Sequence, residues 1–324
     1  DNDDNYDVDA GYNYWGNPNG PQAGDISGNN VNYIPYYTDE AMTDLEPVIT
    51  DLSLTYSGTQ ATFTWTQDSN LTYKIYATND PTEVLTKESS WPGVLSENAS
   101  SGTVYTTSYK FFALVTESWY DGAIKVGYME HTLTKGTSTG YNYVSLCLDN
   151  ASITNNSQLA AALGLASTET INFWNNSLQE WVSTTVLSIS SYACDPVIPL
   201  EVGDIVNVSV NSTKSTVYLT GELPANWGTF DFVTTSTTNM NLAFLPMNKY
   251  QPVVGEEVGV TLQELGDDIG HTNANTISIW DETSQSWITA CYLTNYQVWT
   301  HGAEIIDIGQ GIMIGALHNF TWPD

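Results

Sequence analysis

The sequence predicts an all-β fold, on three observations. Ser, Thr, Asn and Tyr are abundant, which is typical of sheets with one face in water. β-Branched and aromatic residues alternate with polar ones through most of the chain, as strands with one buried face require. Turn-forming residues separate these alternating runs. The 324 residues are enough for two or three such domains.

Residues 1–46 carry the most informative motif. Val8-Asp9-Ala10 precedes Asn13-Tyr14-Trp15-Gly16, and Val31-Asn32-Tyr33-Ile34-Pro35-Tyr36-Tyr37 follows. This segment resembles the last coil of a right-handed parallel β-helix, a fold of many secreted and surface proteins. One coil cannot bury its apolar face without stacked neighbours. The resemblance implies a processed fragment of a longer precursor, or a segment that packs on another molecule, and both favour surface assembly over catalysis.

The same segment supplies the expected assembly residues and one weak metal candidate. Alternate acidic residues offer the oxygen ligands that Ca²⁺ prefers, at Asp3, Asp7 and Asp9. The spacing departs from the EF-hand loop, so a solvated acidic terminus is the competing interpretation. The aromatic set expected to pack against another copy of the chain is Tyr12, Tyr14, Trp15, Tyr33, Ile34, Tyr36 and Tyr37.

Residues 47–135 show the short alternating runs of a β-sandwich. The runs include Ala61–Trp65, Tyr73–Tyr76 and Ser108–Val115. Their order resembles a fibronectin type III domain. The resemblance implies that Trp65 is the core tryptophan and that Tyr109 lies on the strand that carries the family's tyrosine. Residues 136–140 are a linker by composition.

An internal repeat occupies the C-terminal part of the chain. Thr170–Trp174 followed by Trp181 recurs as Thr276–Trp280 followed by Trp287, at a constant offset of about 106 residues. We expect two β-rich modules, residues 141–238 and 239–324, each with a first strand, a short helix and a tryptophan-bearing hairpin. The helices are expected at 157–163 and 262–269, each followed by a glycine. The four tryptophans are expected to fill equivalent cores, unless they form an exposed platform for carbohydrate.

The predicted module is similar to a β-rich unit that follows fibronectin-like domains in archaeal and bacterial envelope proteins. The whole chain therefore resembles a cell-envelope protein of the S-layer, sheath or filament kind. In the first module Cys147 stands where the second has Pro246. That difference suggests a special role for Cys147, such as a disulfide.

Three cysteines and eight glycosylation motifs fit an exported chain. At least one disulfide is expected, between Cys147 and Cys194, with Cys291 buried or bonded to a neighbouring subunit. Three buried free thiols are the alternative. The N-x-S/T motifs are at Asn70, Asn98, Asn150, Asn155, Asn175, Asn207, Asn211 and Asn319.

The charge balance excludes two kinds of partner. Seven basic residues, all lysine, and 37 acidic residues give a formal net charge of −30. Nucleic acids and anionic membrane surfaces bind clustered Lys and Arg, so neither is expected. No apolar run approaches the ~20 residues of a membrane span. The polar opening Asp1-Asn2-Asp3-Asp4 cannot be a signal-peptide core, so we expect any signal to have been removed.

No catalytic residue and no cofactor is predicted. The four histidines have no metal-ligand spacing, and no motif nominates a pair of catalytic carboxylates. The sequence thus predicts a non-enzymatic extracellular protein that assembles with copies of itself into a surface layer, sheath or filament. One alternative is an adhesin or carbohydrate-binding module that uses exposed aromatic residues to bind surface glycans. A secreted polysaccharide-active enzyme is the second alternative.

Overall fold

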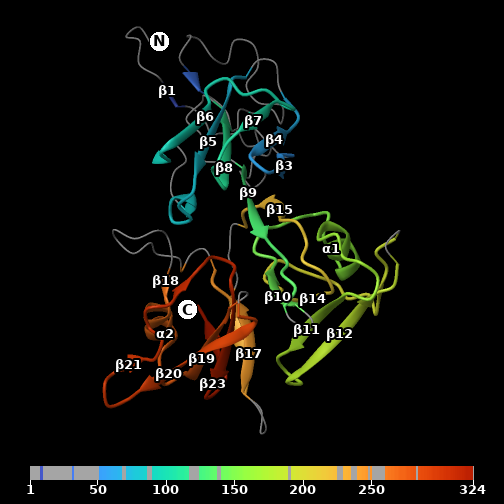
Figure 1. Cartoon of the computed structure of the whole chain (residues 1–324). Coiled ribbons are helices and arrows are strands. Elements are labelled where there is room, and N and C mark those ends of the chain that lie inside the picture. The colour runs from blue at the N-terminus through green and yellow to red at the C-terminus, as the bar shows by residue number, and fades with distance from the viewer. Residues whose placement is uncertain are drawn as a thin grey trace, which may run out of the picture. The chain divides into compact units, whose positions relative to one another are not determined.

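The computed structural model confirms the all-β class. It describes residues 8–9, 31–32, 51–67, 71–85, 90–116, 124–136, 140–188, 191–224, 229–234, 239–246, 249, 260–281 and 284–323. The chain forms two compact units: residues 1–79 with 86–127, and residues 80–85 with 128–324. Figure 1 shows the chain coloured from the N-terminus to the C-terminus.

The first unit contains two antiparallel sheets and one short parallel pair. The three-stranded sheet has the order β3-β4-β7, and the strands β6, β5, β8 and β9 lie side by side in the other. Alternate residues of β3 are buried, as a strand between core and water requires. Strand bounds are β1 Val8–Asp9, β2 Val31–Asn32, β3 Ser53–Ser57, β4 Gln60–Thr64, β5 Tyr73–Thr78, β6 Gly93–Ser96, β7 Val104–Thr106, β8 Phe111–Thr116 and β9 Ile124–His131.

Aromatic side chains fill the space between the two sheets of the first unit. Trp65 is 5% exposed, and its ring centroid lies 5.3 Å from that of Tyr73. Phe63 meets Phe112 of the other sheet edge to face, at 5.0 Å. The residues that alternate in the sequence therefore form the core. The parallel pair β1–β2 places Val8 opposite Val31 and Asp9 opposite Asn32.

The second unit contains two five-stranded sheets with the same arrangement of strands. We name them sheet A, in the order β10-β14-β11-β12-β13, and sheet B, in the order β17-β23-β19-β20-β21. Both are antiparallel. Their bounds are β10 Gly140–Ser145, β11 Thr170–Asn175, β12 Glu180–Val186, β13 Cys194–Asp195 and β14 Ile205–Val210, then β17 Met240–Phe244, β19 Ala274–Asp281, β20 Ser286–Leu293, β21 Val298–Trp299 and β23 Gly311–Ala316.

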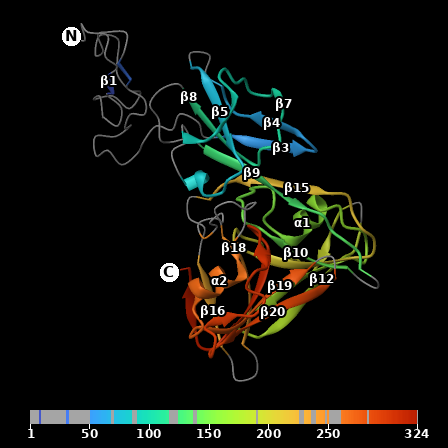
Figure 2. The same cartoon turned by 60° about the vertical axis from the view of Figure 1, so that its left-hand side comes forward.

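One helix contributes side chains to the core of each sheet. Figure 2 labels the two helices, α1 and α2. Helix α1 spans Asn156–Ala162, and the Asn155 side chain caps it by accepting from the Ser157 and Gln158 amides. Helix α2 spans Leu262–Ile269 and begins with a reciprocal capping box between Thr261 and Glu264. The remaining elements are η1 Glu83–Leu85, β15 Val217–Glu222, β16 Phe230–Phe232, β18 Val260–Thr261, β22 Ile305–Ile306 and β24 Phe320–Trp322.

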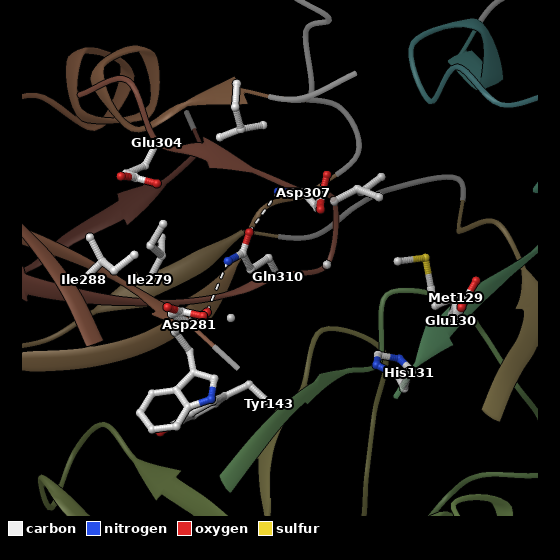
Figure 3. Close-up of a pocket in the computed structure, with 15 residues that line it drawn as sticks. Met129, Glu130, His131, Tyr143, Ile279, Asp281, Ile288, Glu304, Asp307 and Gln310 are labelled. Carbon is white, nitrogen blue, oxygen red and sulfur yellow. Dashed lines mark hydrogen bonds between the residues drawn. The ribbon is translucent and has the colours of Figure 1, made fainter. Parts of the chain in front are cut away.

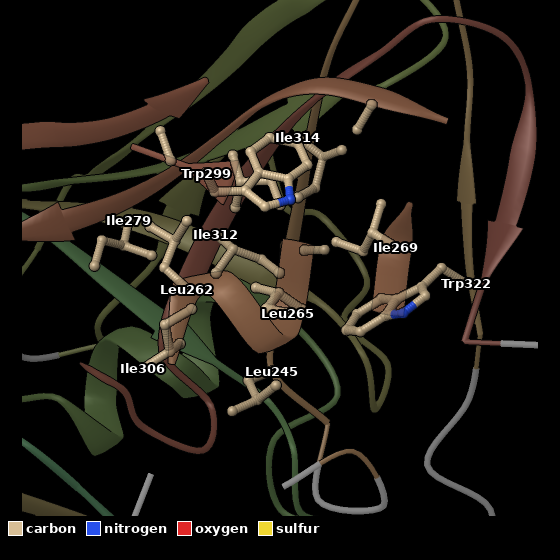
Figure 4. Packing of buried hydrophobic residues seen from close by; sticks show 14 of the residues in the cluster. Leu245, Leu262, Leu265, Ile269, Ile279, Trp299, Ile306, Ile312, Ile314 and Trp322 are labelled. Carbon is tan, nitrogen blue, oxygen red and sulfur yellow. The ribbon is translucent and has the colours of Figure 1, made fainter. Parts of the chain in front are cut away.

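Aliphatic residues dominate the core between each helix and its sheet. Figure 4 shows Leu262, Leu265 and Ile269 of α2 against Ile312 and Ile314 of β23. Gly266 allows this close approach, because a Cβ there would collide with the indole of Trp299. The helices and their following glycines lie within one residue of the predicted positions. The four repeated tryptophans lie outside these two aliphatic cores, whereas Trp299 and Trp322, which are not part of the repeat, belong to the core of sheet B.

Candidate functional site

Reciprocal hydrogen bonds join sheet A to sheet B. The indole Nε1 of Trp174 in β11 donates to the Met240 carbonyl in β17, at 2.9 Å. In return, Nε1 of Trp280 in β19 donates to the Tyr141 carbonyl in β10, at 3.0 Å. Each sheet thus gives one tryptophan to the first strand of the other. We call this contact surface the joint.

A glutamine accompanies each of these tryptophans. Nε2 of Gln179 donates to the Met240 carbonyl at 2.6 Å, and the Tyr141 amide donates to Oε1 of Gln285 at 2.7 Å. Both glutamines follow their tryptophan by five residues and adopt positive φ, 55° and 53°, in the hairpin turns. Since non-glycine residues seldom adopt positive φ, the matched pair indicates that both turns are shaped to present this side chain.

Tyr143 lies at the centre of the aromatic residues of the joint. Its ring centroid is 5.0 Å from Trp287, 5.4 Å from Trp280 and 6.4 Å from Trp181. Cross-strand pairing places Trp174 beside Trp181 in sheet A and Trp280 beside Trp287 in sheet B. Trp280 is 8% exposed, whereas Trp181 is 39% exposed. The prediction that the four tryptophans fill buried cores is therefore wrong for Trp181, which lies at the open rim of the joint, and Trp174 and Trp287 are only half-buried.

Beside this aromatic cluster is an open groove of about 510 Å³. A row of polar side chains crosses its floor: Asn207 is the register partner of Tyr143 and of Asn172, and Asn172 is the partner of Ser183. Nδ2 of Asn172 donates to Oδ1 of Asn207 at 3.1 Å. We define the groove by its nine lining residues: Tyr141, Tyr143, Asn172, Trp181, Ser183, Asn207, Trp280, Gln285 and Trp287.

The environment of the groove keeps its single central phenol neutral. Burial raises the pKa of Tyr143 well above its usual range, and a hydrogen bond with the Asn207 side chain opposes only part of that change. None of the nine lining residues is Lys, Asp, Glu or His. The groove therefore offers aromatic faces, amides and hydroxyls without a formal charge.

A second cavity, of about 540 Å³, lies between β9 and sheet B (Figure 3). Glu130, Asp281, Glu304 and Asp307 lie along it. Among the described residues, no three His, Cys, Asp or Glu side chains are close enough together to hold a metal ion. His131 also lines this cavity; its Nε2 is buried and has no hydrogen-bond partner in the described part of the chain. Burial lowers the pKa of His131 to about 4.

The predicted disulfide does not form, and all three cysteines are free. Cys147 follows β10, whereas Cys194 lies in β13, the opposite outer strand of sheet A. Four strand spacings separate these edges by about 19 Å, far beyond the ~7 Å that a disulfide can span. Cys147 instead packs with Leu242 and Phe244 of sheet B, so it is a small apolar residue of the joint. Cys291 is exposed rather than buried.

The glycosylation motifs fall into three groups. Asn98, Asn211 and Asn319 are exposed. Asn150, Asn155 and Asn175 are half-buried. Asn207 is 4% exposed on the groove floor and its Oδ1 accepts a hydrogen bond from Asn172, so the folded chain does not expose this side chain for covalent attachment of a glycan. The predicted glycosylation of Asn207 is therefore wrong. Asn70 lies outside the described residues.

Other predicted site residues lie largely outside the described part of the chain. All seven aromatic assembly residues fall there, as do Asp3 and Asp7; Asp9 is described only as a backbone member of β1. Two of the other histidines contact aromatic rings: His271 stacks on Tyr292 at 4.1 Å, and His318 lies 6.0 Å from Phe320. Neither helix of the described chain is long and apolar enough to span a membrane.

The sequence pointed to the tryptophans but not to their partners. Gln179 and Gln285 do stand at the offset of 106 residues, so the repeat itself contained that signal. The groove residues Asn172, Asn207 and Ser183 could be grouped only after the strand order was known. Comparisons with protein-family models, curated proteins and solved structures found no match to this chain.

Proposed function

We propose that this protein is a non-enzymatic extracellular structural protein that self-assembles into a surface layer, sheath or filament. The observation that carries the proposal is the parallel pair β1–β2, in which Val8 faces Val31, 23 residues later along the chain. Successive turns of a β-helix pair in this way. Among the described residues this sheet has two strands, and pairing with a strand of another chain would extend it.

A two-stranded parallel sheet is a poor structure in isolation. Parallel sheets in proteins are normally covered on both faces, and two strands alone are at best marginally stable in water. Pairing with the same segment of another copy would extend the sheet and cover the aromatic set of residues 1–46. At ~25 cal/mol per Å² of apolar area, burying several large rings would stabilise such a contact by several kcal/mol.

The rest of the chain has the organisation of a spacer made of β domains. We propose that residues 47–135 are a fibronectin type III-like domain, which the sheet order β3-β4-β7, the neighbouring strands β6-β5-β8-β9 and the buried Trp65 support. We further propose that residues 141–238 and 239–324 are two copies of one envelope-type module. The matched orders of sheets A and B, and the reciprocal tryptophan bonds, support this. A net charge of −30 would keep such a surface hydrated.

Sedimentation velocity of the full chain and of residues 47–324 tests the proposal. We expect the full chain to form larger species as its concentration rises, and the shortened chain to remain a folded monomer. Circular dichroism of the shortened chain serves as the control for folding. A full chain that stays monomeric at every concentration, or a shortened chain that assembles equally well, would overturn the proposal.

A further inference from the structure

The groove combines exposed aromatic rings with buried amide side chains. These residues have no part in the proposed assembly through residues 1–46. Tyr141 is 45% exposed and Trp181 is 39% exposed, although both are large apolar side chains. Below them, Asn172 and Asn207 are only 9% and 4% exposed. We propose that the groove is a binding site for a neutral oligosaccharide. This inference does not rest on the proposed assembly.

The chemistry of a sugar ring matches both kinds of surface. The C–H faces of a pyranose are apolar and stack on aromatic rings, whereas its hydroxyls lie around the edge and both donate and accept hydrogen bonds. Asn and Gln side chains also do both, and the groove presents Asn172, Asn207 and Gln285. Its volume of about 510 Å³ lies within the ~300–1,000 Å³ of small-molecule sites.

Charge selects a neutral ligand over an acidic one. An acidic polysaccharide would need Lys, Arg or a bound cation, and the nine lining residues include no basic side chain. The net charge of −30 would also repel a polyanion over the range of a Debye length, about 8 Å at physiological salt. Among saccharides, the groove therefore favours uncharged hexoses and pentoses.

Sheet B shows that packing does not require these residue types. The groove floor in sheet A is the cross-strand row Tyr143–Asn207–Asn172–Ser183. The corresponding cross-strand row in sheet B is Leu242–Met313–Ser278–Thr289. Leu242 and Met313 are buried in the apolar cluster of the joint. Aliphatic residues thus satisfy the fold at these positions. Sheet A instead has a phenol and an amide there, beside open space, which indicates a role in binding.

Affinity electrophoresis of the full chain tests the site. The native gel would contain one of three neutral polysaccharides, galactomannan, xyloglucan or mixed-linkage β-glucan, or the acidic polygalacturonate as a comparison. We expect at least one neutral polysaccharide to retard the chain and polygalacturonate to have no effect. Trp181→Ala and Tyr141→Ala should each weaken the binding at least tenfold.

Two further variants keep the test specific. Ser183→Leu adds bulk at an exposed position of the groove and should block binding without unfolding the chain. Tyr296→Ala removes a ring that is 76% exposed and is not among the groove residues, so it should bind like the unmodified chain. Thermal unfolding would confirm that all four variants are folded. The proposal is overturned if no neutral polysaccharide retards the chain, or if only polygalacturonate does. It is also overturned if the Trp181→Ala and Ser183→Leu variants are retarded as strongly as the unmodified chain.

Discussion

At the residue scale, burial decides the chemistry of the side chains that the sequence singled out. Cys147 belongs to an apolar cluster, and burial raises the pKa of its thiol to about 12. His131 shows the complementary case, because burial disfavours the charged imidazolium and lowers its pKa. In the described part of the chain, Cys147 forms no disulfide and His131 belongs to no group of three potential metal ligands.

The first prediction concerns His131 and pH. Its folded pKa of about 4 is below the unfolded value of 6.5, so the unfolded chain binds more protons between these values. The contribution of His131 to the free energy of unfolding is therefore complete above pH 6.5 and decreases as the pH falls toward 4. This residue should make the chain about 2 kcal/mol less stable at pH 5 than at pH 7.5.

Urea unfolding at both pH values, for the unmodified chain and for His131→Gln, measures this effect. The difference between the two chains isolates His131 from the many carboxylates that titrate at lower pH. A His131→Gln variant with the same loss of stability at pH 5 would show that another group is responsible.

The second prediction concerns thiol reactivity. Iodoacetamide should modify Cys291 in the native chain, because it is exposed, and should modify Cys147 and Cys194 only after unfolding. Burial raises the pKa of both latter thiols and leaves little of the reactive thiolate. Mass spectrometry of the labelled peptides gives the answer. A peptide in which Cys147 is joined to Cys194 would instead contradict the strand order of sheet A.

At the element scale, one buried asparagine in each sheet forms hydrogen bonds with the chain segment that leads into the first strand. Asn142 accepts from the Thr134 amide at 2.7 Å and donates to the Thr134 carbonyl at 3.2 Å. Asn241 makes the same two contacts with Val233, at 2.9 and 3.0 Å. Both side chains are fully buried in the first strand of their sheet. Each one therefore fixes the chain segment that leads into that strand.

The third prediction follows from these contacts. Asn142→Ala and Asn241→Ala should each lower the free energy of unfolding by about 1–3 kcal/mol, because buried backbone groups lose their partners. Chemical denaturation followed by circular dichroism measures the loss. The exposed Asn98→Ala is the matched control and should stay within ~0.5 kcal/mol of the unmodified chain. A loss of that small size for both buried asparagines would disprove the role assigned to them.

Local elements were predictable to the extent that local physics determines them. Alternation located β4, β5 and β8, and a following glycine marked the end of each helix. The groove was not predictable, because Tyr143, Asn207 and Asn172 become neighbours only through the order β10-β14-β11. The disulfide prediction was wrong for the same reason, since the spacing of Cys147 and Cys194 does not reveal that they lie at opposite sheet edges.

At the scale of the whole molecule, the joint connects sheets A and B through side chains of both. Its apolar cluster takes residues from both sheets, and its polar contacts are reciprocal. A symmetric contact within one chain resembles the self-complementary interface of a dimer. The fourth prediction is that residues 128–324 unfold in a single cooperative transition.

The variant Trp174→Phe with Trp280→Phe tests that prediction. It keeps both rings but removes both indole donors, each worth about 1 kcal/mol. Differential scanning calorimetry should then show two separate transitions or one much broader transition. Trp181→Phe, at the exposed rim, is the matched control and should leave the single transition unchanged. An unchanged transition in the double variant would show that the reciprocal bonds do not couple the sheets.

Electron microscopy of the purified full chain is the most direct test of the proposed function. The chain would be imaged in negative stain over a range of concentrations, beside the chain that lacks residues 1–46. We predict a regular filament or layer from the full chain and single particles from the shortened one. Single particles from the full chain at every concentration would contradict self-assembly, and the same polymer from both chains would contradict the role of the N-terminal segment.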